Sequence, residues 1–202
     1  MNTKLALATL IAALAAPLAV QAAGDPGAGQ TKAAACAGCH GADGNSPAPN
    51  FPKLAGQHAT YIVKELRDFK SGARKDPVMS PQVLALSDQD MEDIAAWFES
   101  RTPAGGSADE ALVARGEALF RAGNASSGVS ACAACHGPAG TGNAPARFPR
   151  LAGQHAQYTV KQLQDFARGT RSNDAGKMMR NIAARMKPAE IEAVASYIQG
   201  LH

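Results

Sequence analysis

The chain has 202 residues and a formal net charge of +3, from 20 lysines and arginines against 17 aspartates and glutamates. This near balance gives no sign of the clustered basic surface that binds nucleic acid, so no nucleic-acid partner is expected. Aromatic residues make up only 5% of the chain, which suits small domains whose cores are not filled by protein side chains alone.

Residues 1–22 have the pattern of a secretory signal peptide. Lys4 precedes an apolar run over residues 5–20, and a small residue follows at Ala22. An uncleaved membrane anchor is the alternative, but a spanning helix needs about 20 apolar residues, and this run is shorter and contains Pro17. We therefore expect the segment to be removed on export to an oxidising compartment.

All four cysteines lie in a motif that occurs twice, with a histidine directly after each pair. C-x-x-C-H is the attachment signature of c-type haem. Two thiols at this spacing form thioethers to the haem vinyl groups, and the histidine is held beneath the iron as its proximal ligand. The motifs comprise Cys36, Cys39 and His40 in the first copy and Cys132, Cys135 and His136 in the second.

Two other uses of four cysteines are conceivable in an exported protein. They could form two disulfides, or a single zinc site, since paired C-x-x-C is also zinc spacing. Neither alternative gives the two histidines a role, and a zinc site would join cysteines from distant parts of the chain. The interpretation we favour is two covalently attached haem c groups.

The sequence around the motifs is duplicated. Residues 51–59 (FPKLAGQHA) return as residues 148–156 (FPRLAGQHA), and the similarity continues beyond them. Two copies are too few for a solenoid, which needs at least three repeats, so tandem domains are expected. Proline, paired glycine and serine between the copies predict a flexible linker with few contacts. The predicted units are residues 23–102, the linker 103–107 and residues 108–202.

Each unit is expected to be all-α, because no stretch alternates apolar and polar residues with period two. The first helix is predicted from Gly29 to about Ala35 in one unit and from Asp109 to Ala122 in the other. In the second unit, a surface loop rich in serine, glycine and asparagine then precedes the cysteines.

Two further helices are predicted in each unit. The middle one is amphipathic and ends at Gly72 or Gly169, which act as C-terminal breakers. The last one begins at Ser87 in the first unit, where Asp90 completes a capping box. In the second unit Pro188 occupies the first helical position, which partly compensates for a weaker cap.

Aligning the two units finds a candidate for the second axial ligand of each haem. Met79 lies opposite Met179, in the segment between the middle and last helices. Met178 competes with Met179, but it aligns with a valine, which cannot bind iron. Met91 and Met186 are expected to fill the cores instead, the usual role of methionine.

His58 and His155 occupy matched positions directly before the middle helices. As alternative axial ligands they would give bis-histidine haems with lower reduction potentials. We favour their being solvated residues at a helix start.

With histidine and methionine as ligands, the reduction potential of the haem is raised and the coordination sphere of the iron is closed. Such an iron passes one electron but has no open position for oxygen or peroxide, which favours a carrier over a catalyst.

Each unit resembles a class I cytochrome c domain, and the tandem resembles the dihaem cytochrome c4 family. The resemblance covers residues 23–202 and rests on C-x-x-C-H, then Phe-Pro-x-Leu-Ala-Gly-Gln, then methionine, twice. It implies an all-α fold wrapped around each haem. It also implies that the carbonyls of Pro52 and Pro149 accept a hydrogen bond from the ring of the proximal histidine.

The resemblance also implies that the first and last helices of each unit cross at a glycine and an aromatic residue. An alanine replaces the expected aromatic residue in the first unit. The residues at these crossings are Gly29, Ala33 and Trp97 in the first unit and Gly116, Phe120 and Tyr197 in the second.

As a function, the resemblance implies a periplasmic electron carrier that is not an enzyme. It would be soluble or peripherally bound to the membrane, and its partners would be redox proteins of the respiratory chain. Electrons would pass from a quinol-oxidising complex to a terminal oxidase or reductase. The alternatives are the dihaem subunit of a dehydrogenase, such as a flavocytochrome complex, and a dihaem peroxidase. Lys53 and Arg150 are candidate contacts for haem propionates or a partner, or else solvated charges.

Overall fold

The computed structural model describes residues 24–202. Within this range the chain forms helices and turns without a β-strand, apart from two isolated bridges, so the all-α prediction is confirmed. The predicted signal peptide at residues 1–22 lies outside the described residues. No helix within residues 24–202 has the length and apolar character needed to span a bilayer.

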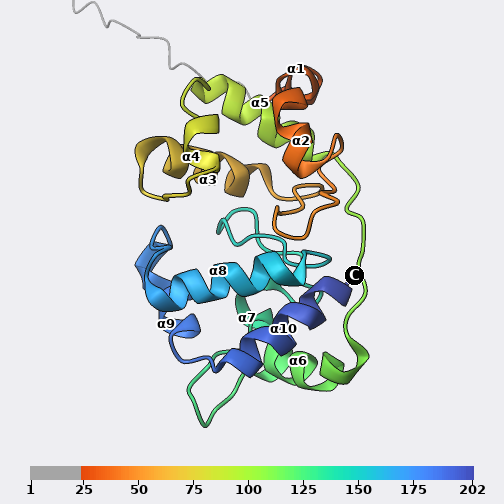
Figure 1. Cartoon of the computed structure of the whole chain (residues 1–202), viewed down its shortest axis with the longest axis vertical. Helices are drawn as coiled ribbons and strands as arrows, with labels where there is room; N and C mark the ends of the chain where they lie inside the picture. Colours follow the sequence, from red (N-terminus) through yellow and green to blue (C-terminus); the bar gives the residue numbers. More distant parts are fainter. Residues whose placement is uncertain (1–23) are drawn as a thin grey trace, which may run out of the picture.

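The described chain folds as two halves with corresponding elements, stacked along the long axis of the molecule (Figure 1). The first half contains α1 (Pro26–Lys32), η1 (Ala33–Cys36), α2 (Ala37–His40), α3 (Ala59–Ser71), α4 (Met79–Gln82) and α5 (Asp88–Glu99). The second half contains α6 (Glu110–Ala122), α7 (Ala133–His136), α8 (Ala156–Arg168), η2 (Ala175–Lys177), α9 (Met178–Ala183) and α10 (Pro188–Gly200). Each half has its own apolar core.

Most helix ends lie where the sequence predicts them. The Ser87 side chain accepts from the Asp90 amide, and the Asp90 carboxylate accepts from the Ser87 amide, which completes the predicted capping box. Gly72 and Gly169 end α3 and α8 with φ of +79° and +74°. In this left-handed conformation glycine has no steric penalty.

The first helix begins earlier than predicted. It starts at Pro26 rather than Gly29, because Asp25 caps it by accepting from the Gly27 amide at 2.7 Å. It then tightens into the 3₁₀ turn η1, which carries the chain to Cys36. The Asp-Pro pair is a start signal of the kind that a search for apolar periodicity overlooks.

Glycine allows the first and last helices of each half to cross closely. A Cβ atom on Gly29 would lie 2.0 Å from the Asp93 carbonyl oxygen, and one on Gly116 would lie 2.3 Å from that of Ala193. Both distances are far below van der Waals contact, so the helices could not approach this closely with any other residue. The implied glycine crossings are therefore present in both halves.

The two crossings are reinforced in different ways. In the second half the rings of Phe120 and Tyr197 pack 5.5 Å apart. In the first half, where the aromatic residue is replaced, Lys32 Nζ lies 2.6 Å from carboxylate oxygens of both Asp90 and Asp93. A charged contact on α5 thus occurs where an aromatic pair fails to form.

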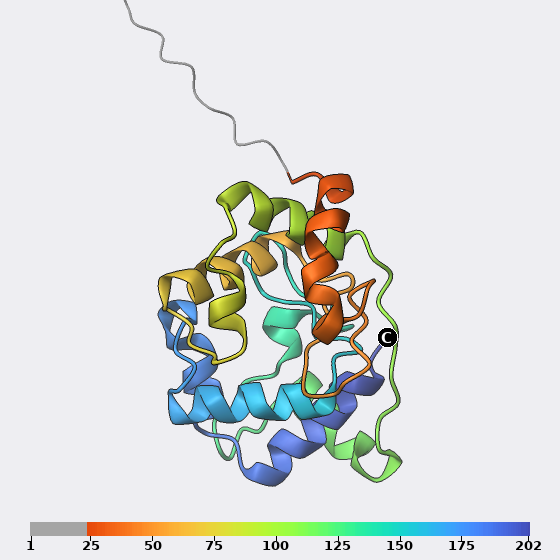
Figure 2. The same cartoon turned by 45° about the horizontal axis from the view of Figure 1, so that its top comes forward.

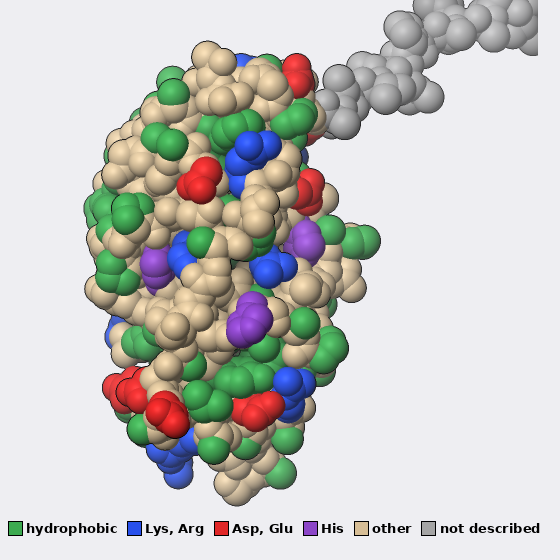
Figure 3. All heavy atoms as spheres, turned by 90° about the vertical axis from the view of Figure 1, so that its right-hand side faces the viewer, with side chains coloured by type: hydrophobic (Ala, Val, Ile, Leu, Met, Phe, Trp, Pro, Cys, Tyr) green, Lys and Arg blue, Asp and Glu red, His purple; other side chains and the backbone are tan. Residues whose placement is uncertain are grey.

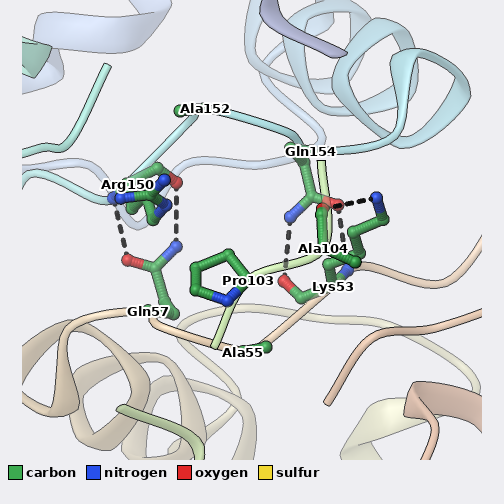
Figure 4. Close-up of a pocket in the computed structure, with 8 residues that line it drawn as sticks. All are labelled: Lys53, Ala55, Gln57, Pro103, Ala104, Arg150, Ala152 and Gln154. Carbon is green, nitrogen blue, oxygen red and sulfur yellow. Dashed lines mark hydrogen bonds between the residues drawn. The ribbon is translucent and has the colours of Figure 1, made fainter. Parts of the chain in front are cut away.

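The two halves meet through a reciprocal pair of glutamines (Figure 4). Gln57 donates to the Arg150 carbonyl at 2.9 Å and accepts from the Arg150 amide at 2.8 Å. Gln154 makes the same two bonds to the backbone of Lys53, both at 2.9 Å. Each side-chain amide therefore pairs with the backbone of the other half, as a β-strand neighbour would.

The two histidines before the middle helices also join the halves. His58 Nε2 donates to the Thr141 carbonyl and His155 Nε2 donates to the Ser46 carbonyl, both at 2.8 Å. The prediction that these are solvated residues was wrong. They do begin α3 and α8, at the capping positions, but their rings reach across the interface.

The linker makes more contacts than its composition predicts. Lys53 Nζ donates to the carbonyls of Ala104 and Gly105, and the Ala104 amide donates to Asn45 Oδ1. Gln199 on α10 donates to another linker carbonyl, at 2.8 Å. Figures 1 and 2 both show the linker extended along one side of the molecule. The expectation that the linker makes few contacts was therefore wrong, because these bonds tie it to both halves.

Candidate haem sites

One short helix in each half carries the second cysteine and the histidine, and the first cysteine directly precedes it. The last residue of α2 is His40 and the last residue of α7 is His136. On such a turn the first cysteine and the histidine, four residues apart, lie on the same face. None of the four cysteines forms a disulfide, and within residues 24–202 no cluster of three or more histidine, cysteine, aspartate or glutamate side chains forms.

Both histidines are buried and oriented by a carbonyl. Their exposed fractions are 5% for His40 and 6% for His136. Nδ1 of His40 donates to the Pro52 carbonyl and Nδ1 of His136 to the Pro149 carbonyl, each at 2.9 Å. These are the bonds that the family resemblance implies. They fix the tautomer and leave Nε2 of each ring free to bind a metal.

The protonation state of the two histidines also suits metal binding. Burial lowers the pKa of His40 and of His136, and the hydrogen bonds to the proline carbonyls only partly oppose it. Because an imidazole binds metal in its neutral form, both rings are ready to act as ligands at neutral pH. Burial also raises the pKa of the Cys132 thiol to about 11 and raises that of Cys36.

The structure brings one candidate methionine into each core. Met79, the first residue of α4, packs against the first core, which also contacts Cys36. Met179, on α9, packs against the second core, which also contacts Cys132. Its competitor Met178 has 42% of its surface exposed.

The other two methionines of the described halves are core residues. Met91 on α5 is only 1% exposed, and Met186 packs against the second core. Both match the role predicted for them. Met79 and Met179 are therefore the core-facing methionines at matched positions in the segment that joins the middle and last helices.

A carboxylate holds the methionine-bearing segment in each half. Asp76 Oδ1 accepts from the amide of Met79 at 3.0 Å. Asp174 Oδ2 accepts from the amide of Arg180, the residue after Met179, also at 3.0 Å. These bonds position the turn from which each thioether is presented, and the sequence alignment gave no indication of them.

The side chains of each half fit a c-type haem. In each half the first cysteine and the methionine border one apolar core, whose α3 or α8 wall is aliphatic and aromatic, and the second cysteine and the histidine lie on the short helix that follows the first cysteine. The donor set contains no carboxylate or hydroxyl oxygen, so it suits iron in a macrocycle rather than a hard cation. The wall residues are Ile62, Leu66 and Phe69 in the first half and Leu163 and Phe166 in the second.

Comparisons with known proteins place these features in a family. The family model for cytochrome c matches residues 25–102 and 113–202. The chain is 54% identical over 197 residues to cytochrome c4 of Pseudomonas aeruginosa, covering 97% of this chain and 98% of that relative. The solved structure of reduced recombinant cytochrome c4 from Pseudomonas stutzeri has a TM-score of 0.87 and 53% identity, and the match covers 89% of this chain and 100% of that one.

A further relative has a different name. The chain is 45% identical over 179 residues to a protein of Stutzerimonas stutzeri named thiosulfate dehydrogenase electron acceptor. That match covers 85% of this chain and 81% of the relative.

Proposed function

Because this chain belongs to the cytochrome c4 family and is a dihaem c-type electron carrier, we propose that it shuttles single electrons in the periplasm between redox proteins of the respiratory chain. In this proposal it accepts electrons from a quinol-oxidising complex and delivers them to a terminal oxidase or reductase. It works as a soluble protein or bound peripherally to the membrane.

We assign the predicted residues to the two haems as follows. Each C-x-x-C pair forms the thioethers, and the histidine and methionine of the same half are the axial ligands. When bound, each haem supplies an iron that cycles between Fe(II) and Fe(III). The first haem takes Cys36, Cys39, His40 and Met79, and the second takes Cys132, Cys135, His136 and Met179.

One observation carries the proposal. In both halves a buried histidine with Nδ1 bound to a proline carbonyl lies in the same half as a methionine, Met79 or Met179, that packs against the core from matched positions between the middle and last helices. A soft thioether favours the reduced iron and raises the reduction potential. If a histidine and a methionine both hold the iron, it would have no open position for peroxide. This favours an electron carrier over a dihaem peroxidase.

The related electron acceptor supports a second candidate donor. The relative named thiosulfate dehydrogenase electron acceptor suggests that the donor is a dehydrogenase instead of a quinol-oxidising complex. The carrier role and the residues that perform it are the same in both cases, and only the donor differs.

The carrier function is tested by counting electrons and following their transfer. Coulometric titration of the haem-loaded protein is expected to take up two electrons per chain, both returned to an added terminal oxidase. Reduced protein is expected to react slowly with oxygen or hydrogen peroxide alone. Separate assays with a quinol-oxidising complex and with a thiosulfate dehydrogenase identify the donor. Rapid peroxide turnover by the protein would contradict the proposal.

A further inference from the structure

A buried polar cluster lies between the halves, outside the haem sites. It is formed by Glu65 on α3, Gln162 on α8, and one arginine that follows each of these helices, Arg74 and Arg171. All four residues have exposed fractions between 6% and 8%. Buried arginines are uncommon unless they are paired, so the arrangement of their partners is informative.

Each arginine reaches into the other half. Arg74 of the first half donates from Nη2 to Gln162 Oε1 of the second half at 2.8 Å. Arg171 of the second half donates to the Tyr61 hydroxyl of the first half at 2.9 Å and to the same Gln162 oxygen at 2.8 Å. The two guanidinium groups therefore converge on one oxygen, close to each other.

A single carboxylate offsets their charge. Glu65 Oε2 lies 2.6 Å from Arg74 Nη1 and 3.1 Å from Arg171 Nη2. Burial by itself raises the pKa of the Glu65 carboxyl, but attraction to Arg171 and Arg74 outweighs this and lowers the pKa to about 2. Glu65 is therefore ionised at neutral pH, and it is the acidic residue shared by both arginines.

The cluster breaks the symmetry of the repeat. Glu65 and Gln162 occupy matched positions, each four residues after the tyrosine that opens the shared helix pattern. Beside Glu65, the Asn173 side chain donates to Glu65 and to Asp68, and Lys64 Nζ donates to Glu65 and to the Asn173 carbonyl. Beside Gln162 there is instead a hollow of about 210 Å³. The first half thus supplies the carboxylate and the second half supplies a neutral amide.

We propose that Glu65 is the positioning residue of the two-haem relay, because its carboxylate holds Arg74 of its own half and Arg171 of the other half and thereby fixes the spacing of the two haem sites. This rests on the proposed carrier function, in which electrons pass between the haems. Without the carboxylate, two buried cations would face each other across neutral acceptors. Such an arrangement is strongly unfavourable, so the halves would separate or shift.

The near symmetry of the cluster supplies a sharp test. In E65Q the carboxylate is lost, and in E65Q/Q162E it is moved to the other half, where the Gln162 oxygen already accepts from both arginines. Lys161, the counterpart of Lys64, lines the adjoining hollow. The matched control is D165N, since the Asp165 carboxylate bonds only Lys161, Arg168 and Thr170 of its own half.

Two measurements on the haem-loaded protein report the spacing. The first is hydrogen exchange at the amides of Lys53 and Arg150, which donate across the interface. The second is the iron–iron distance distribution from pulsed electron paramagnetic resonance of the ferric protein. We expect E65Q to exchange these amides about tenfold faster or more and to broaden the distribution. The swap and D165N are expected to retain parental values.

Either of two results would overturn the proposal: parental exchange and distances in E65Q, or a swap variant that fails to restore them. If E65Q does not fold, the swap variant decides alone. It also lacks the carboxylate at position 65 but carries one at position 162. Absorption spectra recorded on the same samples report the haem ligands independently. Wrong ligands would count against the proposed function, whereas intact ligands with unchanged spacing would count against Glu65 alone.

Discussion

Replacing Met79 or Met179 with leucine is expected to remove half of the weak far-red absorption band that marks methionine bound to ferric haem. The double variant M79L/M179L is expected to lose the band entirely. Leucine has a similar volume and conserves the packing, but it cannot bind iron. Because thioether ligation favours Fe(II), the potential of the altered haem should fall by on the order of 0.1 V, a fraction of the roughly 0.8 V that axial ligands span. Spectra and a redox titration measure both effects.

The other methionines are matched controls for this experiment. M91L changes a core residue that is 1% exposed, and M178L changes the neighbour of Met179, which is 42% exposed. Both variants are expected to keep the full band and the parental potentials. Loss of the band in M178L with its retention in M179L would show that the assignment in the second half is shifted by one residue.

Changing Cys36 and Cys39 together to alanine is expected to halve the covalent haem content, from two groups per chain to one. The first core has few aromatic side chains, and its largest component is the haem in our account, so this half should also lose protected amides. Folding and cofactor binding are coupled in such small domains. Quantification of covalent haem after denaturation measures the first effect, and hydrogen exchange measures the second.

The corresponding change in the second half provides the control. Alanine at Cys132 and Cys135 is expected to remove the other haem and to loosen the second core, while the first half keeps its haem. Retention of two covalent haems in either double variant would contradict the assignment of the thioether cysteines.

The fold within each half could be predicted from local sequence signals. Ser87 and Asp90 formed the expected capping box, and Gly72 and Gly169 ended their helices. These features depend on residues a few positions apart, so their physics is contained in a short stretch of sequence. The missed start at Pro26 was also a local signal, in the Asp25 cap.

The way in which the halves meet could not be predicted. The Gln-His pair recurs in both copies. The sequence does not, however, separate a histidine that is solvated at a helix start from one that contacts the other half across an interface. Glu65 lies on the polar side of α3, which the periodicity assigns to solvent, and Arg74 follows that helix. They are buried because the polar faces of the two halves pack against each other, a property of the assembled pair.

One face of the molecule carries side chains of both charges. On the face drawn in Figure 3, lysines and arginines are interspersed with aspartates and glutamates.

The most direct test of the central claim is near-infrared magnetic circular dichroism of the oxidised, haem-loaded protein. This method separates histidine–methionine from bis-histidine ligation of low-spin ferric haem by the position of the charge-transfer band. With Met79 and Met179 as ligands, the intensity should correspond to two histidine–methionine haems per chain. A bis-histidine band from either haem, implicating His58 or His155, would contradict the account.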